Sequence, residues 1–213
     1  MTGMNKTKIF GTIALVCLCL GGVLLSTFPQ FLRYVKGDIR AFEEVAAGEL
    51  KAGELVHGVI DITDGCIASN EETKSTFGIE TSKRTTALYY SIVGYDDQYM
   101  LYETGNTEQY ATLDALADEC ERYYSDENAD AEEPHSFLEF TAVVRNMPDD
   151  LSAIVQECYG NDYVQYFEQV MLVSANFKSY PVNIAIGAAG AVLGIVFLIL
   201  TIVSWRKSKQ FSY

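Results

Sequence analysis

The sequence contains few of the residues that enzymes use to bind metals or to activate nucleophiles. His57 and His135 are its only histidines, and neither lies on an expected helix, where a second ligand three or four positions away would share its face. No G-x-S-x-G, G-x-x-x-x-G-K or G-x-G-x-x-G motif occurs. We therefore predict no catalytic residue, no cofactor and no metal site. His57, which alternates with Leu55 and Val59, is expected to be a partly buried structural histidine.

The sequence also lacks a C-x-x-C pair. Cys17 and Cys19 lie in the first apolar run, and the three others are Cys66, Cys120 and Cys158. Three cysteines allow at most one internal disulfide with one thiol left over. Cys120 and Cys158 fall on apolar stripes of expected helices, which favours buried free thiols over a disulfide.

Charge is absent from two long stretches, residues 9–28 and 182–205. Residues 184–203 alone are enough to cross a hydrocarbon core of ~30 Å at ~1.5 Å per residue. We predict two transmembrane helices. The first run has the alternative of a cleaved signal peptide, but no small-x-small cleavage site follows it, which favours an uncleaved anchor. The lack of charge inside both runs argues against an ion pathway or a proton relay.

Charge is distributed very unevenly along the chain. All 29 acidic residues lie between Asp38 and Glu168, against 10 basic residues in the same loop, so the loop carries −19. Both tails are basic, and positive flanks tend to stay in the cytoplasm. We predict cytoplasmic tails at 1–8 and 206–213, spans at 9–28 and 182–205, and an acidic extracytoplasmic domain at 29–180. Arg33, Lys36 and Arg40 argue for the opposite orientation.

The segment between the spans has alternating β-type and helical patterns. Strands are expected at residues 55–63, 85–93, 98–103, 137–145 and 166–174, and helices at 41–50, 107–124 and 151–159. Residues 69–83 are expected to be a polar loop or loose hairpin, and Gly58 marks a bulge or bend. This order is that of an OB-like five-stranded, partly open barrel. An unrelated α+β sheet with the same order is the alternative.

Tyrosines are concentrated on one expected hairpin. Tyr89, Tyr95, Tyr99 and Tyr102 are a possible interaction surface for a sugar or a peptide, although strands favour tyrosine for packing alone. A nucleic acid needs a basic groove beside such aromatics, and a domain at −19 repels phosphate, so nucleic acid is excluded.

The second apolar run carries small residues at helix-packing spacing. Gly187, Gly190 and Gly194 allow a helix backbone to approach closely, within the chain or between copies. A homo-oligomer formed through the second span is therefore one possible assembly.

Four segments resemble an uncharacterised bacterial family of small membrane-anchored proteins of Gram-positive type, known only as a domain of unknown function. They are ELKAGELVHGVID at 49–61, ALYYSI at 87–92, LDALA at 113–117 and FLEFT at 137–141. The resemblance covers roughly residues 40–175 and implies no activity, substrate or catalytic residue. In architecture the chain is also similar to the membrane-flanked OB-like domains of NfeD-type proteins.

These patterns lead to one main functional hypothesis. The chain is expected to be a non-enzymatic, two-pass cell-membrane protein that presents an acidic interaction or scaffold domain to another membrane or cell-envelope protein. One alternative is a ligand-binding sensor that acts through a membrane partner. The other is a membrane-bound hydrolase, which would need His57 or a thiol such as Cys66 beside a carboxylate.

Overall fold

The structure is a computed structural model that describes residues 3–76, 79–94, 97–125 and 132–210. The chain forms two compact units. One consists of Met1–Gly37 with Asn176–Tyr213, and the other of Asp38–Ala175.

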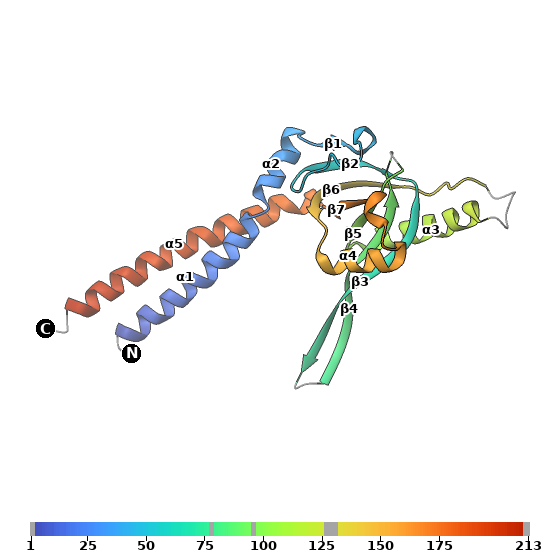
Figure 1. Ribbon diagram of the computed structural model, residues 1–213. Helices are drawn as coiled ribbons and strands as arrows, with labels where there is room; N and C mark the ends of the chain where they lie inside the picture. Colours follow the sequence, from blue (N-terminus) through green and yellow to red (C-terminus); the bar gives the residue numbers. More distant parts are fainter. Residues whose placement is uncertain (1–2, 77–78, 95–96, 126–131, 211–213) are drawn as a thin grey trace. The chain divides into compact units, whose positions relative to one another are not determined.

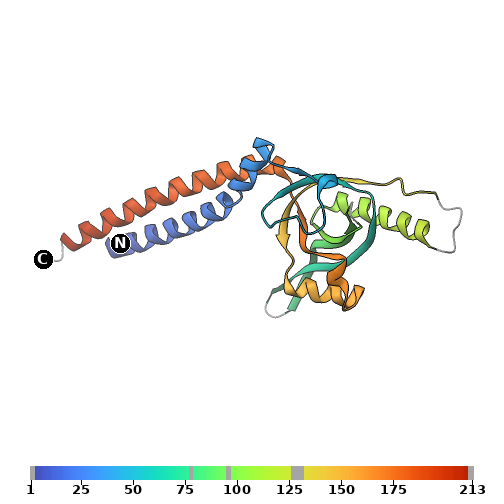
Figure 2. The same cartoon turned by 45° about the horizontal axis from the view of Figure 1, so that its top comes forward.

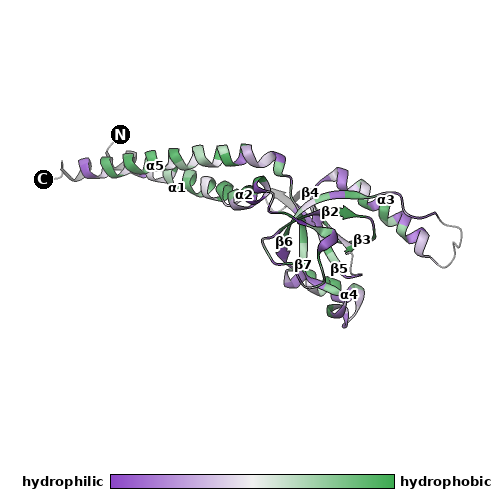
Figure 3. Ribbon diagram, turned by 90° about the horizontal axis from the view of Figure 1, so that it is seen from above, coloured by the Kyte–Doolittle hydropathy of each residue, from purple (hydrophilic) through white to green (hydrophobic). Residues whose placement is uncertain are grey.

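The first unit is built on two long apolar helices that pack along each other, α1 (Gly3–Leu25) and α5 (Tyr180–Gln210) (Figures 1 and 2). A shorter helix, α2 (Phe28–Lys36), follows α1. Within the described residues, two helical stretches are long and apolar enough to cross a membrane, Thr7–Lys36 and Phe177–Lys207, and only 11% of each apolar window is buried. Their apolar side chains therefore face outward, which indicates a membrane protein. Figure 3 colours most of both helices green, for hydrophobic residues.

Small residues let α1 and α5 approach closely. The predicted packing glycines face α1 of the same chain: a Cβ added at Gly194 would lie 2.7 Å from Leu18 Cγ, and one at Gly187 would lie 2.9 Å from Leu24 Cβ. At Gly190 the nearest atom would be 3.5 Å away, which is ordinary contact. Sequence reasoning missed Gly21 on α1, where an added Cβ would lie 2.9 Å from backbone atoms of α5.

Gly21 and Gly22 offer a matched test of this packing. Gly21→Leu should force the helices apart, because its nearest neighbours are backbone atoms, whereas Gly22 has nothing within 4 Å. The measurement is the disulfide yield of a Gly11→Cys/Thr201→Cys pair without native cysteines, since a Gly11 Cβ would lie 3.6 Å from Thr201 Cγ2. We expect a several-fold lower yield with Gly21→Leu and no change with Gly22→Leu. Equal yields would show that Gly21 does not set the helix spacing.

The second unit is a mixed seven-stranded sheet with helices on both faces. Its strand order is β1-β2-β6-β7-β5-β4-β3, in which β1–β2 and β5–β7 are parallel pairs and the other pairs are antiparallel. The strands are β1 (Arg40–Ala41), β2 (Leu55–Ile60), β3 (Thr63–Thr76), β4 (Ile79–Val93), β5 (Tyr99–Thr104), β6 (Leu138–Asn146) and β7 (Phe167–Ser174). The helices are α3 (Thr107–Tyr124) and α4 (Asp149–Tyr159).

Each helix buries its apolar stripe against one face of the sheet. Leu113, Leu116 and Cys120 of α3 join the larger core, with residues from β2, β4, β5, β6 and β7. Leu151 and Val155 of α4 join a smaller core with residues of β5 and β7. Figures 1 and 2 show the sheet curving around α3.

The prediction of a β-rich α+β domain flanked by two apolar helices is confirmed, but the five-stranded barrel is wrong. The sheet has seven strands, and across the described residues its outer strands β1 and β3 do not pair, so it is open. Residues 69–83 lie largely in the β3–β4 hairpin rather than in a loop. The hairpin was one of the two predicted alternatives; main-chain hydrogen bonds hold it without apolar side chains, so its sequence can be polar.

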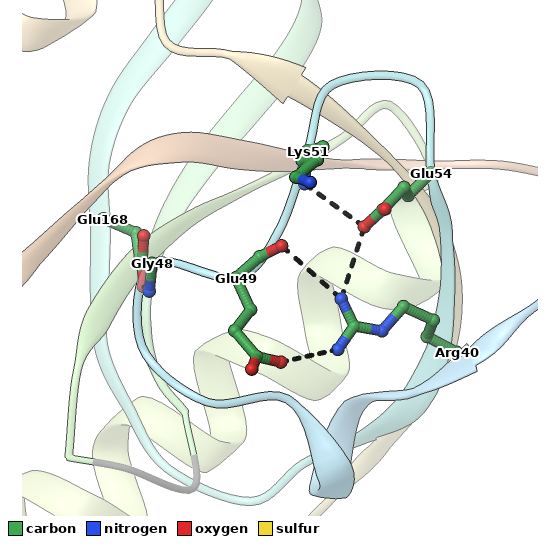
Figure 4. Close-up of polar contacts among 6 residues, drawn as sticks. All are labelled: Arg40, Gly48, Glu49, Lys51, Glu54 and Glu168. Atoms are coloured by element: carbon green, nitrogen blue, oxygen red, sulfur yellow. Dashed lines mark hydrogen bonds and ion pairs between the residues drawn. The ribbon is translucent and has the colours of Figure 1, made fainter.

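The helix expected at 41–50 is also wrong. Only Phe42–Glu44 form a 3-10 turn, and Gly48 and Gly53 have positive φ angles of 75° and 92° that end any helix. Arg40 holds the following loop: its guanidinium nitrogens lie 2.8 Å from Glu49 Oε2 and 3.5 Å from Glu54 Oε2 (Figure 4). These ion pairs raise the pKa of Arg40. The Gly48 N–H donates to Glu168 Oε1 at 2.5 Å, which ties the loop to β7.

Gly58 has a different role from the bulge that the sequence predicts. The β2–β6 register runs without a shift from Leu55 to Ile60, so no bulge forms. A Cβ at Gly58 would instead collide with Phe42 Cβ. Phe42 is 2% exposed and packs edge-on against Phe140, with ring centroids 5.4 Å apart. The glycine therefore makes room for a buried aromatic side chain.

A double-mutant cycle tests this close approach. Gly58→Ala should lower the free energy of unfolding by about 1–3 kcal/mol, because Phe42 has to move. In a Phe42→Gly background the same change should cost at least about 1 kcal/mol less, since the Cβ atom that obstructs the new methyl group is gone. Chemical denaturation of the detergent-solubilised chain, followed by circular dichroism, gives these values. Equal costs in both backgrounds would mean that the two residues do not interact.

An acidic pocket as the candidate functional site

The second unit contains a cavity of about 860 Å³ between α3 and neighbouring parts of the sheet domain. This volume is within the range of ligand sites in proteins, ~300–1,000 Å³. Its lining comprises Ile62, Thr63, Asp64, Val93, Asp97, Tyr99, Ala117, Asp118, Cys120, Glu121 and Tyr124. Separate elements supply these residues, so the fold brings them together.

Four carboxylates give the pocket its chemical character. Asp64 comes from β3, Asp97 from the segment before β5, and Asp118 and Glu121 from α3. Asp118 and Glu121 are three positions apart and thus neighbours on the helix surface. Among the described residues that line the pocket, none is Lys or Arg. The electrostatic field of the lining therefore favours a positively charged group.

Hydrogen bonds fix Asp64 in place. The Tyr159 hydroxyl, at the end of α4, lies 2.8 Å from Asp64 Oδ2 and 2.6 Å from Ser91 Oγ. Burial first, and then the adjacent Asp64 carboxylate, raise the pKa of Tyr159, so its hydroxyl stays protonated and donates. Thr63, beside Asp64, is buried and donates to the Ser91 carbonyl at 2.6 Å. Asp64 is therefore supported by β4 and α4 together.

Tyr99 joins the pocket to an aromatic cluster. Its ring centroid lies 5.5 Å from that of Tyr159, and its ring stacks on Phe167 at 6.2 Å with an interplanar angle of 15°. Burial, and then the nearby Asp64 carboxylate, raise the pKa of Tyr99. Tyr124, at the end of α3, also lines the pocket and is 61% exposed. The pocket thus has two aromatic side chains beside its carboxylates, the combination that binds organic cations.

Two further acidic residues of α3, Asp114 and Glu119, make structural contacts. Asp114 accepts a hydrogen bond from the Tyr90 hydroxyl at 2.7 Å. Glu119 accepts from the backbone N–H groups of His135 and Ser136, both at 2.8 Å, and these bonds lower the pKa of Glu119. Asp118 and Glu121 are the acidic residues of this helix that the pocket uses.

Gln109 anchors the first turn of α3 to the sheet. Its Oε1 accepts hydrogen bonds from the hydroxyls of Thr104 at 2.5 Å, Ser174 at 3.0 Å and Tyr102 at 3.3 Å. These donors belong to β5 and β7, so one side-chain oxygen ties the helix to two strands. No periodicity or motif in the sequence marked this residue.

The predicted tyrosine surface does not exist as a single platform. Tyr102 is wholly buried in the core beneath α3, and Tyr89 is half-buried on the face that carries α4. Only Tyr99 reaches the pocket, and Tyr95 lies outside the described residues. Side chains alternate between the two faces of a strand, so tyrosines on one hairpin are divided between two cores.

The cysteines are free thiols. Cys120 is 4% exposed, so the prediction of a buried thiol is confirmed, and burial raises its pKa. Its side chain lies at the pocket wall. Cys158 is exposed, contrary to prediction, because Tyr159 occupies the place against the sheet at the end of α4. Cys66 is also exposed; its Sγ donates to the Ala68 carbonyl at 3.3 Å, and partial burial raises its pKa. A nucleophilic cysteine needs a lowered pKa, so the raised pKa values of Cys120 and Cys66 argue against that role.

The two histidines lie outside the pocket. His57 is exposed, not partly buried as predicted, and its Nδ1 lies 2.7 Å from the Phe140 carbonyl oxygen on β6. His135 is exposed, as its position after the acidic loop implies. Within the described part of the chain, no three His, Cys, Asp or Glu side chains are placed to hold a metal ion. The pocket carboxylates are therefore spread around a larger space.

Sequence reasoning did not identify the pocket. Asp64 and Asp97 had the pattern of turn residues, and Asp118 belonged to the solvent-facing side of a helix. Nothing in the sequence relates these two segments to Asp118 and Glu121 on α3.

Comparison with protein-family models, with curated proteins and with solved structures found no match for the chain. The resemblance to the Gram-positive family therefore stays a prediction, and the site rests on its own geometry.

Proposed function

We propose that the chain is a two-pass, non-enzymatic membrane protein whose acidic domain binds a positively charged segment of another membrane or cell-envelope protein. The observation that supports this proposal is the pocket, in which four carboxylates and two tyrosines line about 860 Å³. The two exposed apolar helices that precede and follow the domain in the sequence support its membrane location.

The chemistry of the pocket favours a partner with Arg or Lys side chains. Such a side chain brings a charge for the carboxylates and an apolar stem for Ile62, Val93 and Ala117. The guanidinium or ammonium group gains a further contact from the faces of Tyr99 or Tyr124. A domain tethered by spans at both ends stays near the bilayer, so its partners belong to the membrane or the envelope.

A sensor for a small organic cation is the second candidate. The volume of the pocket supports it, because a space of this size encloses a small ligand. In this proposal the sensor acts through a separate membrane partner. The hydrolase alternative gains no support: His57 contacts β6, and the pKa values of Cys66 and Cys120 are raised.

Removing charge from the pocket should weaken binding of a basic probe. The probe is a fluorescein-labelled hexa-arginine peptide, whose anisotropy is measured with the full-length detergent-solubilised chain at physiological salt. For Asp118→Asn/Glu121→Gln we expect a Kd about tenfold higher, equivalent to two contacts of ~0.7 kcal/mol each. Glu139→Gln/Glu157→Gln removes the same charge at exposed positions outside the pocket and should change the Kd less than about twofold.

The control variant Glu139→Gln/Glu157→Gln distinguishes binding in the pocket from attraction by the net charge of the domain. If both double variants weaken binding equally, the net charge attracts the peptide and the pocket is not its site. If the unmodified chain binds spermidine more tightly than it binds the peptide, and the pocket variant loses this preference, the small-cation sensor is favoured over the protein partner.

The proposed orientation places both termini in the cytoplasm, and exposed Cys158 provides a reporter for the domain. In one variant Cys158 is the only cysteine; in a second, Cys158 is also replaced and Ser208→Cys is the only cysteine. Intact cells are labelled with a membrane-impermeant maleimide. We expect labelling of Cys158 and none at position 208 until the cells are opened. The reverse pattern would place the domain in the cytoplasm.

A further inference from the structure

We propose that α2 lies in the interfacial plane of the bilayer and binds anionic phospholipid headgroups. This inference rests on the membrane location proposed above. It concerns a segment that neither the pocket nor the pairing of α1 with α5 uses.

Local signals make α2 a helix separate from α1. The hydroxyls of Ser26 and Thr27 donate to the carbonyls of Val23 at 2.7 Å and Leu24 at 3.0 Å, which satisfies carbonyl groups at the end of α1. Pro29 lies in the first turn of α2, where its fixed φ suits a helix start. Gly37 ends the helix in the left-handed conformation, with φ of 72°. The nine residues thus begin and end independently of the span.

The apolar side of α2 is divided into a covered part and an exposed part. Tyr34 stacks on Phe177 with ring centroids 4.4 Å apart and planes 10° apart, so the chain just before α5 covers that edge. Phe28, Leu32 and Val35, at positions i, i+4 and i+7, share the adjacent strip and are 41%, 38% and 63% exposed. None of the residues of α2 is buried.

The polar side of α2 is basic in an otherwise acidic protein. The helix contains Arg33 and Lys36 and no acidic residue, although the chain as a whole carries −14. At ~100° per residue, Lys36 borders the exposed strip and Arg33 lies one step further round the helix. An apolar strip bordered by Lys and Arg is the pattern of a helix that lies in the headgroup region.

The bilayer is the occupant because α2 continues directly from a membrane-type helix. The apolar stretch that can span a membrane runs from Thr7 through Lys36 and includes α2. A helix that turns aside at the end of a span meets the interface first, where aromatic residues such as Phe28 are favoured. This placement also explains why Arg33 and Lys36 lie on the domain side of the first span. They bind headgroups there and do not report the orientation.

Tryptophan substitution tests the two sides of α2 separately. In a Trp205→Phe background, Val35→Trp places the probe on the exposed strip and Gln30→Trp places it on the opposite side. The full chain is reconstituted in phosphatidylcholine vesicles with 30% phosphatidylglycerol. We expect lipids brominated near the glycerol to quench Val35→Trp about twofold or more strongly than Gln30→Trp, and acrylamide to show the reverse order.

Headgroup preference is measured by energy transfer from Val35→Trp to pyrene-labelled lipids. Transfer to pyrene-phosphatidylglycerol should exceed transfer to pyrene-phosphatidylcholine. Arg33→Gln/Lys36→Gln should abolish this preference, because each basic residue near an anionic surface is worth about fivefold in local lipid binding. Equal transfer to both lipids in the unsubstituted helix would overturn the proposed headgroup binding.

A third probe separates failure of this inference from failure of the membrane location. Val16→Trp lies on the exposed side of α1, at 50% exposure. If lipids brominated near the ends of their acyl chains quench Val16→Trp, but Val35→Trp and Gln30→Trp respond alike to lipids brominated near the glycerol, α2 is not an interfacial helix. If none of the three is quenched, the chain does not span the bilayer and the proposed function itself fails.

Discussion

The packing of α3 against the curved sheet is the interaction on which the domain depends. Leu113 and Leu116 are wholly buried in the larger core, which also contains residues from five strands, so this one helix completes that core. The same packing builds the pocket: once the apolar stripe of α3 is buried, Asp118 and Glu121 are held at the pocket wall. Gln109 secures the start of the helix through three hydroxyl donors.

The concentration of negative charge sets the chemistry of this domain. A loop at −19 repels itself, and part of that charge is engaged within the protein: Arg40 pairs with Glu49 and Glu54, and hydrogen bonds hold Asp114 and Glu119. The pocket carboxylates are different, because no basic side chain lines the pocket in the described part of the domain. A cationic partner would relieve that repulsion, so charge that opposes folding becomes a source of binding specificity.

Different interactions hold the helical unit and the domain together. Between α1 and α5 the hydrophobic effect contributes little in lipid, so close backbone approach at Gly21, Gly187 and Gly194 supplies the contact. In the domain, by contrast, large aromatic side chains such as Tyr90, Tyr102 and Phe167 fill the cores. The chain thus packs small residues between its proposed transmembrane helices and large aromatic residues in the cores of its domain.

Local sequence by itself determined α1, α3, α4, α5 and most strands, because their apolar spacing reflects the period of each element. Residues 107–124 were predicted with the bounds that α3 has, and the apolar runs became α1 and α5. Strand pairing was beyond such reasoning: the parallel β5–β7 pair joins segments more than 60 residues apart. Three features depend on how the strands and helices pack together: the division of the tyrosines between two cores, the position of Gly58 beside Phe42, and the pocket. These features were decided only by tertiary structure, because contacts between distant segments leave no period in the sequence.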